Sequence, residues 1–186
     1  MSTRSANKSL LAIVLVSLVG MGLASYLTTT HFEVQKAEHA ADTSFALEDL
    51  KAKSACDVGG NTSCVEVSRS KWATIDLGEE SHALPLSALV LGFFLTTGLL
   101  GFLALRGDGE RRKQSVDLVA ALAAIGILDG LFLVYIQAIE IKQWCLFCLG
   151  IDACNIILLV AAARASEEGL LSAIKSALPP KMPVAL

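Results

Sequence analysis

Four long apolar runs dominate the pattern of hydrophobic and polar positions along the chain. They are Leu10–Leu27, Leu84–Leu105, Val116–Ile139 and Trp144–Ala163. The first two contain no charged residue, and the last two carry only Asp117, Asp129 and Asp152. A bilayer core about 30 Å thick needs roughly 20 helical residues at 1.5 Å each, so every run is long enough to span it. The pattern predicts four transmembrane helices.

Composition favours a membrane protein over other classes. Hydrophobic residues make up 54% of the 186 positions and charged residues 18%, whereas soluble domains carry about 25% charged residues. This excludes a disordered chain, and a net charge of −3 provides no basic surface for nucleic acid. Two alternatives are weaker. A soluble core of four such helices needs more polar sequence to cover it, and a cleaved signal peptide has a shorter apolar stretch than the first run.

Basic residues flank the runs asymmetrically. They lie before the first run, between the second and third, and after the fourth, at Arg4, Lys8, Arg106, Arg111, Arg112, Lys113, Arg164, Lys175 and Lys181. With four spans, all these segments lie on one side of the membrane, which the positive-inside rule makes cytoplasmic. We therefore expect cytoplasmic N- and C-termini, with the long segment 31–83 on the outer side.

The chain is predicted to divide into a transmembrane domain over 1–165 and a short cytoplasmic tail over 166–186. In the outer segment we expect a short helix that is capped by Ser44, carries Phe45 on its partly apolar side and ends before Cys56. Residues 55–70 are predicted to form an irregular loop around a glycine-rich turn at 59–61. In the tail, a weak amphipathic turn or two is expected over 166–178.

The five cysteines suggest redox chemistry on the outer side. Cys145 and Cys148 form a CxxC motif at the start of the fourth run, where a helix places the sulfurs one turn apart and its dipole favours a thiolate on the first. Cys56 and Cys64 flank the glycine turn, which can bring them together. Two such pairs suggest a relay from a partner through the loop pair to the membrane pair. Cys154, rotated about 240° from Cys148, is expected to be a buried apolar filler.

Two other interpretations of the cysteines stay open. Both pairs could be structural disulfides in a membrane scaffold without catalytic activity. A zinc site built from the same four cysteines is disfavoured, because the loop spacing exceeds that of a zinc knuckle and an oxidising compartment opposes four free thiolates.

A polar stripe continues from the CxxC motif along the fourth span. Cys145, Cys148, Asp152 and Asn155 are spaced i, i+3, i+7 and i+10, so they share one helix face that we expect to point towards other helices. Helical rise places Asp152 about 12 Å, and Asp129 of the third span about 15 Å, below the outer surface. We hypothesise that one or both carboxyls are protonated and serve a reduced acceptor beside the CxxC motif. The alternative is that they only hydrogen-bond across helices.

The cysteine segments resemble those of the vitamin K epoxide reductase family. The resemblance rests on Cys56-Asp57-Val58-Gly59, on the segment from Ser63-Cys64 to Trp72, and on Trp144-Cys145-Leu146-Phe147-Cys148. It covers roughly residues 10–163. It implies an all-α integral membrane protein in which a four-transmembrane-helix bundle surrounds a quinone, with a cysteine-bearing extracytoplasmic loop between the first two helices.

The resemblance also implies roles for individual residues. Cys148 would lie nearest the quinone, Cys145 would exchange with Cys64 of the loop, and Cys56 would pair with Cys64 and meet the partner. Ser70 matches a loop serine near the family's site, and Asp152 stands where animal members have a tyrosine beside the quinone. Quinone contacts are accordingly expected from Asp152, Asp129, Ser70, Asn155 and Phe147.

The implied function is a thiol:quinone oxidoreductase that supports disulfide-bond formation. Bacterial members of the family oxidise a periplasmic thioredoxin-fold protein and pass the electrons to ubiquinone or menaquinone, and many carry that domain fused after the bundle. This chain ends about 23 residues after its fourth span, so we expect a separate periplasmic thioredoxin-fold partner, a bacterial inner (plasma) membrane location and a periplasmic loop. The alternatives are a reductase of vitamin K quinone or its epoxide, working in the opposite direction, and the scaffold.

Overall fold

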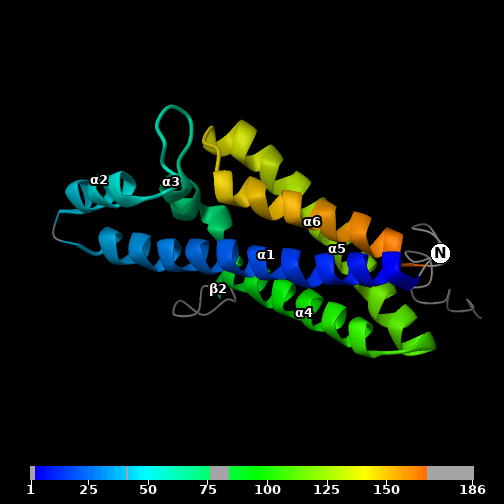
Figure 1. The fold of residues 1–186 in the computed structure, drawn as a ribbon. Coiled ribbons are helices and arrows are strands. Elements are labelled where there is room, and N and C mark those ends of the chain that lie inside the picture. The colour runs from blue at the N-terminus through cyan, green and yellow to red at the C-terminus, as the bar shows by residue number, and fades with distance from the viewer. Residues whose placement is uncertain (1–2, 41, 76–83, 167–186) are drawn as a thin grey trace, which may run out of the picture. The chain divides into compact units, whose positions relative to one another are not determined.

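The computed structural model describes residues 3–40, 42–75 and 84–166, which are mainly helical (Figure 1). The long helices are α1 (Thr3–Glu38), α4 (Leu86–Arg106), α5 (Gly109–Ile136) and α6 (Leu146–Ala165). The shorter elements are α2 (Thr43–Lys53), α3 (Cys64–Arg69), the 3-10 helix η1 (Lys71–Ala73), the π-helix η2 (Gln137–Ile141) and the antiparallel strands β1 (Thr74–Ile75) and β2 (Leu84–Pro85). The all-α fold class is confirmed.

Each apolar run forms one helix that is long and apolar enough to cross a membrane, with η2 continuing α5 in the third. Much of this apolar surface is not covered by protein. Leu18 of α1 and Leu128 of α5, for example, expose 57% and 67% of their surface. Exposed apolar area on this scale needs lipid around it, while the helices satisfy their own backbone hydrogen bonds. The four apolar helices indicate a multi-pass membrane protein.

The described residues form two compact units. The first contains the N-terminal part of α1, most of α4, the N-terminal two thirds of α5 and the C-terminal part of α6. In this unit α1 and α4 approach closely at Gly101, where a Cβ atom would lie 2.8 Å from Ile13 Cγ2. One turn of α4 away, the hydroxyls of Ser17 and Thr97 hydrogen-bond at 3.1 Å with both side chains fully buried. The lack of a side chain at Gly101 is therefore what lets these two helices pack.

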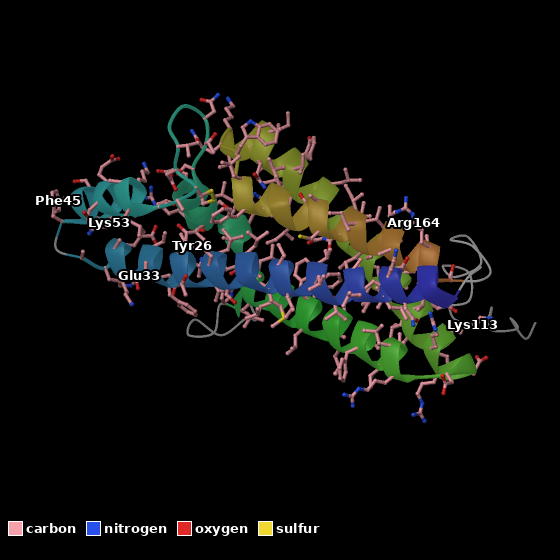
Figure 2. All side chains as sticks on the ribbon, viewed as in Figure 1. Tyr26, Glu33, Phe45, Lys53, Lys113 and Arg164 are labelled. Atoms are coloured by element: carbon pink, nitrogen blue, oxygen red, sulfur yellow. A yellow bond between two sulfur atoms is a disulfide. The ribbon has the colours of Figure 1, made fainter. Side chains whose placement is uncertain are left out.

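The basic residues of the first unit gather at the ends of its helices. Lys8 lies near the start of α1, Arg106 at the end of α4, Lys113 in the first turns of α5 and Arg164 near the end of α6. Figure 2 shows Lys113 and Arg164 at the same end of this unit. The described helices thus bring together the charges from which the sequence predicts a cytoplasmic face.

The second unit contains the C-terminal part of α1, the outer elements α2, α3 and η1, and the ends of the other spans next to them. Val34 of α1, Leu47 of α2 and Val65 of α3 belong to one buried cluster that joins the three helices. Charged groups surround it. Lys51 pairs with Glu66 at 2.7 Å. Arg69 of α3 pairs with Glu38 of α1 and with Glu66 of its own helix.

The ion pair between Lys51 and Glu66 keeps Lys51 charged into the alkaline range. The hydrogen bond that Lys51 donates to the Glu66 carboxylate is the largest cause that raises the pKa of Lys51 above its usual value of 10.5. A raised lysine pKa gives stability that is fully present below the unfolded-state pKa and is lost only as the pH rises through the folded-state value. The contact between α2 and α3 is therefore intact at neutral pH.

Two expectations for the outer segment need correction. The cap of α2 is Asp42 rather than Ser44. Its carboxylate accepts the Phe45 N–H at 3.1 Å and the Ser44 hydroxyl at 2.8 Å, and these hydrogen bonds hold the pKa of Asp42 below its usual value. The loop expected over 55–70 is only partly irregular, because 64–69 form α3 with Ser63 as its cap. The amphipathic turn or two expected over 166–178 lies, apart from Ser166, outside the described residues.

Replacing Leu47 by alanine should loosen the attachment of α2 to α1 and α3. Leu47 is 7% exposed, and truncating a buried leucine typically costs about 2 kcal/mol or more. Hydrogen exchange in detergent solution should show faster exchange across α2 and α3. The matched control is Phe45→Ala in the same helix, because Phe45 is 72% exposed and loses little on truncation. Equal exchange in the two variants would contradict the assigned core.

Candidate functional site

The four outer cysteines meet where the loop touches the start of α6. Cys56 and Cys64 form a disulfide with a Cα–Cα distance of 5.6 Å, and Cys145 and Cys148 form another with a distance of 5.2 Å. Between the pairs, Cys64 Sγ lies 3.2 Å from Cys145 Sγ. Thiol–disulfide exchange proceeds by direct attack of one sulfur on another. The two pairs therefore lie within reach of direct exchange.

Backbone contacts set this arrangement. The cysteine hairpin, residues 56–64, turns at Gly59 and Gly60, whose φ angles of 90° and 67° suit glycine. Its returning strand then bonds to Trp144, because the Ser63 N–H donates to the Trp144 carbonyl at 3.0 Å and the Trp144 N–H donates to the Asn61 carbonyl at 2.8 Å. Ser63 and Trp144 each directly precede a cysteine. This register places Cys64 against Cys145.

The CxxC motif begins directly before α6. Cys145 precedes the first helical residue, and its sulfur accepts the Cys148 N–H at 3.1 Å. Its own N–H donates to Gln137 Oε1 at 2.8 Å. A sulfur that accepts an N–H at a helix N-terminus is favoured as a thiolate, through the hydrogen bond and the helix dipole together. The expected thiolate-stabilising geometry is thus present at Cys145.

Burial isolates the relay sulfurs from solvent. Cys56 and Cys64 are fully buried and Cys145 is 1% exposed, while Val58 in the hairpin is 70% exposed. The sulfurs of Cys56, Cys64 and Cys145 all lie within 4.8 Å of one another, close enough in principle to ligate a metal. Both pairs are disulfides here, so none of these sulfurs is a thiolate ligand. The arrangement matches an exchange site.

The polar stripe of α6 packs on small residues of α5. Asp152 lies against Gly130, where a Cβ atom would come so close to the carboxylate that the Asp152 side chain would have to shift. Asn155 lies against Gly126 and is 4% exposed, and its Oδ1 has no hydrogen-bond partner among the described residues. Asp129 is exposed on α5. The stripe therefore faces another helix, as its spacing predicts.

The other residues expected at a quinone lie in different settings. Phe147 contacts Tyr26 edge to face, with ring centroids 4.7 Å apart. Ser70 ends α3, and its hydroxyl donates to the Val67 carbonyl at 2.7 Å. Cys154 is a free thiol, 6% exposed.

Three residues at the site were not found by sequence reasoning. The Tyr26 hydroxyl accepts the N–H of Ala55, next to Cys56, at 3.0 Å. Gln137 accepts the Cys145 N–H, and the Trp72 ring N–H donates to Glu140 at 2.8 Å. The available signal was the presence of a polar group in or beside an apolar run, because such a group needs a hydrogen-bond partner when it is buried.

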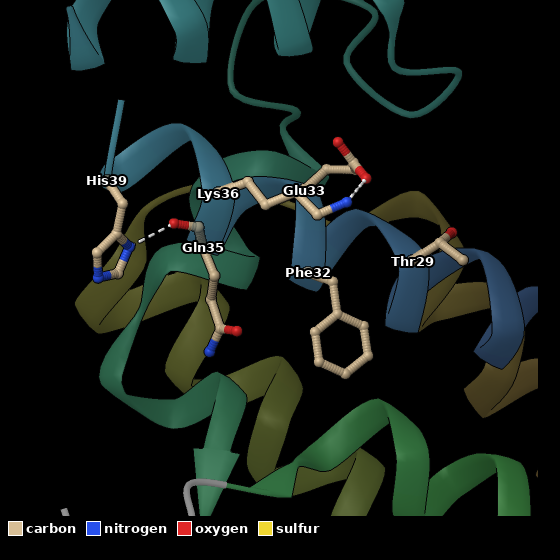
Figure 3. Close-up of a pocket in the computed structure, with 6 residues that line it drawn as sticks. All are labelled: Thr29, Phe32, Glu33, Gln35, Lys36 and His39. Atoms are coloured by element: carbon tan, nitrogen blue, oxygen red, sulfur yellow. Dashed lines mark hydrogen bonds and ion pairs between the residues drawn. The ribbon is translucent and has the colours of Figure 1, made fainter. Parts of the chain in front are cut away.

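A surface hollow of about 650 Å³ lies elsewhere in the second unit (Figure 3). Its described lining comes from α1 and consists of Thr29, Phe32, Glu33, Gln35, Lys36 and His39. Lys36 and Glu33 pair within it at 2.6 Å, and the ring of His39 contacts the Gln35 carbonyl. None of the five cysteines lines it, so it is not the redox site.

Replacing Tyr26 by phenylalanine should expose the loop disulfide to reductants. The change keeps the ring contact with Phe147 and removes the acceptor of the Ala55 N–H, which loosens the chain beside Cys56. We expect a water-soluble phosphine to reduce the Cys56–Cys64 disulfide about fivefold faster, which corresponds to the loss of roughly one hydrogen bond. The control is Tyr135→Phe, at a side chain that is 61% exposed. Equal rates in both variants would rule out a role for the Tyr26 hydroxyl.

Comparison with known families agrees with this geometry. The model of the Vitamin K epoxide reductase family matches residues 11–163, and the match includes both cysteine pairs and nearly all of the four apolar runs. Members of that family use quinones. Together with the cluster of sulfurs, the match indicates a membrane thiol oxidoreductase. The chain belongs to the vitamin K epoxide reductase family.

Proposed function

We propose that the protein is a thiol:quinone oxidoreductase that takes electrons from a thioredoxin-fold partner and passes them to a quinone, and thereby supports disulfide-bond formation. The observation that carries this proposal is the 3.2 Å distance between the sulfurs of Cys64 and Cys145. Two purely structural disulfides have no need to lie in contact. Two disulfides that exchange with each other do.

The proposed relay consists of balanced exchange steps. A partner thiolate attacks Cys56 and releases Cys64 as a thiolate, and the second partner thiolate resolves this mixed disulfide, so the partner leaves oxidised and Cys56 becomes a thiolate. Cys64 then attacks Cys145 and releases Cys148 as a thiolate. Finally Cys56 attacks Cys64, which restores the loop disulfide and releases Cys145. One dithiol has been oxidised and the CxxC pair reduced.

Entry of electrons requires movement of the cysteine hairpin. Because Cys56 is fully buried, a protein thiolate cannot approach it in line in the closed arrangement. The exposed turn at Gly59 and Gly60 and the exposed side chain of Val58 form the outer surface of the hairpin. We propose that the partner docks there and displaces the hairpin to reach Cys56.

Residues of α6 fit the acceptor's needs. Cys148 is the more exposed member of the CxxC pair, Phe147 offers an aromatic face nearby, and the buried side-chain carbonyl of Asn155 has no hydrogen-bond partner in the part of the chain that the structure describes. We propose that these residues and Asp152 hold a quinone, with Asp129 and Ser70 as further candidates. The chemistry that a quinone supplies when bound is acceptance of two electrons and two protons. A protonated Asp152 would hold one of these protons.

We propose a membrane orientation from the distribution of basic residues. The basic ends of the first unit would face the cytoplasm, and the cysteine loop would face the periplasm across the inner membrane. From Cys145, directly before α6, to Arg164 near its end the chain advances 19 residues, or about 28 Å at helical rise, which matches the hydrocarbon thickness. A periplasmic loop meets the oxidising compartment in which disulfides persist.

Purified protein should catalyse quinone reduction by a reduced thioredoxin-fold donor. With oxygen excluded, a ubiquinone and a menaquinone analogue are tested separately, and consumption of one quinone per donor dithiol is expected. Cys148→Ser should lower the rate by roughly a hundredfold or more, because no CxxC disulfide can form. Cys154→Ser is the matched control and should keep full activity. If the intact protein consumes neither quinone, the acceptor has been assigned wrongly.

Replacing Asp152 by asparagine should slow turnover by roughly a hundredfold or more, in the range seen for loss of a proton-transferring group. The side chain keeps its size against Gly130, so packing changes little. Asp129→Asn tests the neighbouring carboxyl in the same way. The measurement is the quinone-reduction rate together with the apparent affinity for the quinone. If both variants match the parent in rate and affinity, the carboxyls only bond across helices.

A further inference from the structure

The turn that precedes the CxxC motif has an unusual backbone. The last turn of the third span widens into the π-helix η2, and the chain then reverses at Lys142, which has a φ of 56°. A π-turn is rare and less stable than a regular helix, and a left-handed lysine adds local strain. Such a turn persists only where other contacts hold it, and such turns are frequent at functional sites.

One of these contacts is the hydrogen bond between Gln137 and Cys145. Gln137 is 2% exposed, and its Oε1 accepts the Cys145 N–H at 2.8 Å. Cys145 stands just before α6 and is itself 1% exposed. Neither the helix nor water therefore offers its N–H another acceptor. Gln137 therefore anchors the backbone at Cys145, next to the Trp144 bonds to the hairpin.

The other side of η2 is held by the loop. The Trp72 ring N–H donates to Glu140 at 2.8 Å, and the Trp72 ring packs edge to face on Phe132 with centroids 5.8 Å apart. Lys71 lies 3.8 Å from the same glutamate, and α3, which begins at Cys64, also packs on η2. The five-residue turn η2 thus contacts both α3, which carries Cys64, and Cys145 itself.

We propose that Gln137 is a positioning residue for exchange between the two cysteine pairs. Its carbonyl oxygen holds Cys145 so that the sulfur stays within reach of Cys64 while accepting the Cys148 N–H. Holding one reacting group in place raises its effective concentration at the other. The proposal rests on the relay proposed above, but it does not depend on the identity of the quinone or of the partner.

The test isolates the exchange step in the full-length Cys148→Ser protein. There Cys145 has no disulfide partner of its own and can attack the Cys56–Cys64 disulfide. It then forms a Cys64–Cys145 disulfide and releases Cys56 as a thiolate, with no net oxidation. After equilibration, acid quenching and alkylation, peptide mass mapping gives the ratio of the two disulfides. Cys154 remains a free thiol in both forms and serves as the internal standard.

Gln137→Met in this background should lower the ratio of Cys64–Cys145 to Cys56–Cys64 disulfide by roughly tenfold. Methionine keeps the length and apolar stem of glutamine but removes the acceptor, which leaves a buried N–H unpaired. Gln137→Glu keeps an oxygen acceptor and should restore the ratio at high pH. The negative charge of its carboxylate disfavours the Cys145 thiolate, so the pH midpoint of exchange should rise. If Gln137 only supported the fold, Gln137→Glu would neither restore the disulfide ratio at high pH nor raise the pH midpoint of exchange.

The matched control is Gln143→Met, the same change six residues later in the chain. Gln143 is partly exposed, so the ratio should stay at the parent value. The proposal is overturned if Gln137→Met keeps the parent ratio, or if Gln137→Glu remains as impaired as Gln137→Met at every pH. If the Cys148→Ser parent forms no Cys64–Cys145 disulfide, both the relay and the role of Gln137 are wrong.

Discussion

The site depends on two backbone hydrogen bonds between the cysteine hairpin and Trp144. They are short-range and directional, and they fix the register of Asn61 and Ser63, which directly precedes Cys64, on Trp144, which directly precedes Cys145. A shift of this register by one residue would turn alternate side chains to the opposite face. The contact between the sulfurs would then be lost. The covalent chemistry is therefore set by main-chain pairing between segments that lie some 80 positions apart in the sequence.

The length of α1 explains how the outer elements are supported. α1 has 36 residues and is about 54 Å long, well beyond the roughly 30 Å of a hydrocarbon core. Its C-terminal turns carry Val34 and Ala37, which pack on α2 and α3 through Leu47 and Val65. The extra length of the helix thus serves as a stem for the loop elements. A loop of this size, without such a stem, would have little apolar surface with which to fold.

Local patterns in the sequence predict the spans and the cysteine pairs, while contacts between distant residues escape them. Apolar runs and the CxxC spacing depend on neighbours within one helix, and these predictions agree with the structure. The cap of α3 was a missed local signal, because Ser63 and Glu66 have the spacing of a capping box. The contacts of Tyr26 and Trp72, unlike the α3 cap, are not local. Their partners lie 29 and 68 positions away, so only the folded chain identifies them.

Burial of the sulfurs and pairing of the hairpin together constrain the order of events in the proposed relay. A partner can reach Cys56 only if the hairpin moves, and the hairpin is tied down by the bonds from Asn61 and Ser63 to Trp144. Breaking those bonds also removes Cys64 from Cys145. The open form would therefore accept electrons without passing them on, and the closed form would pass them on while excluding other thiols. In the proposed relay, sequential opening and closing would keep other thiols from reducing the CxxC pair directly.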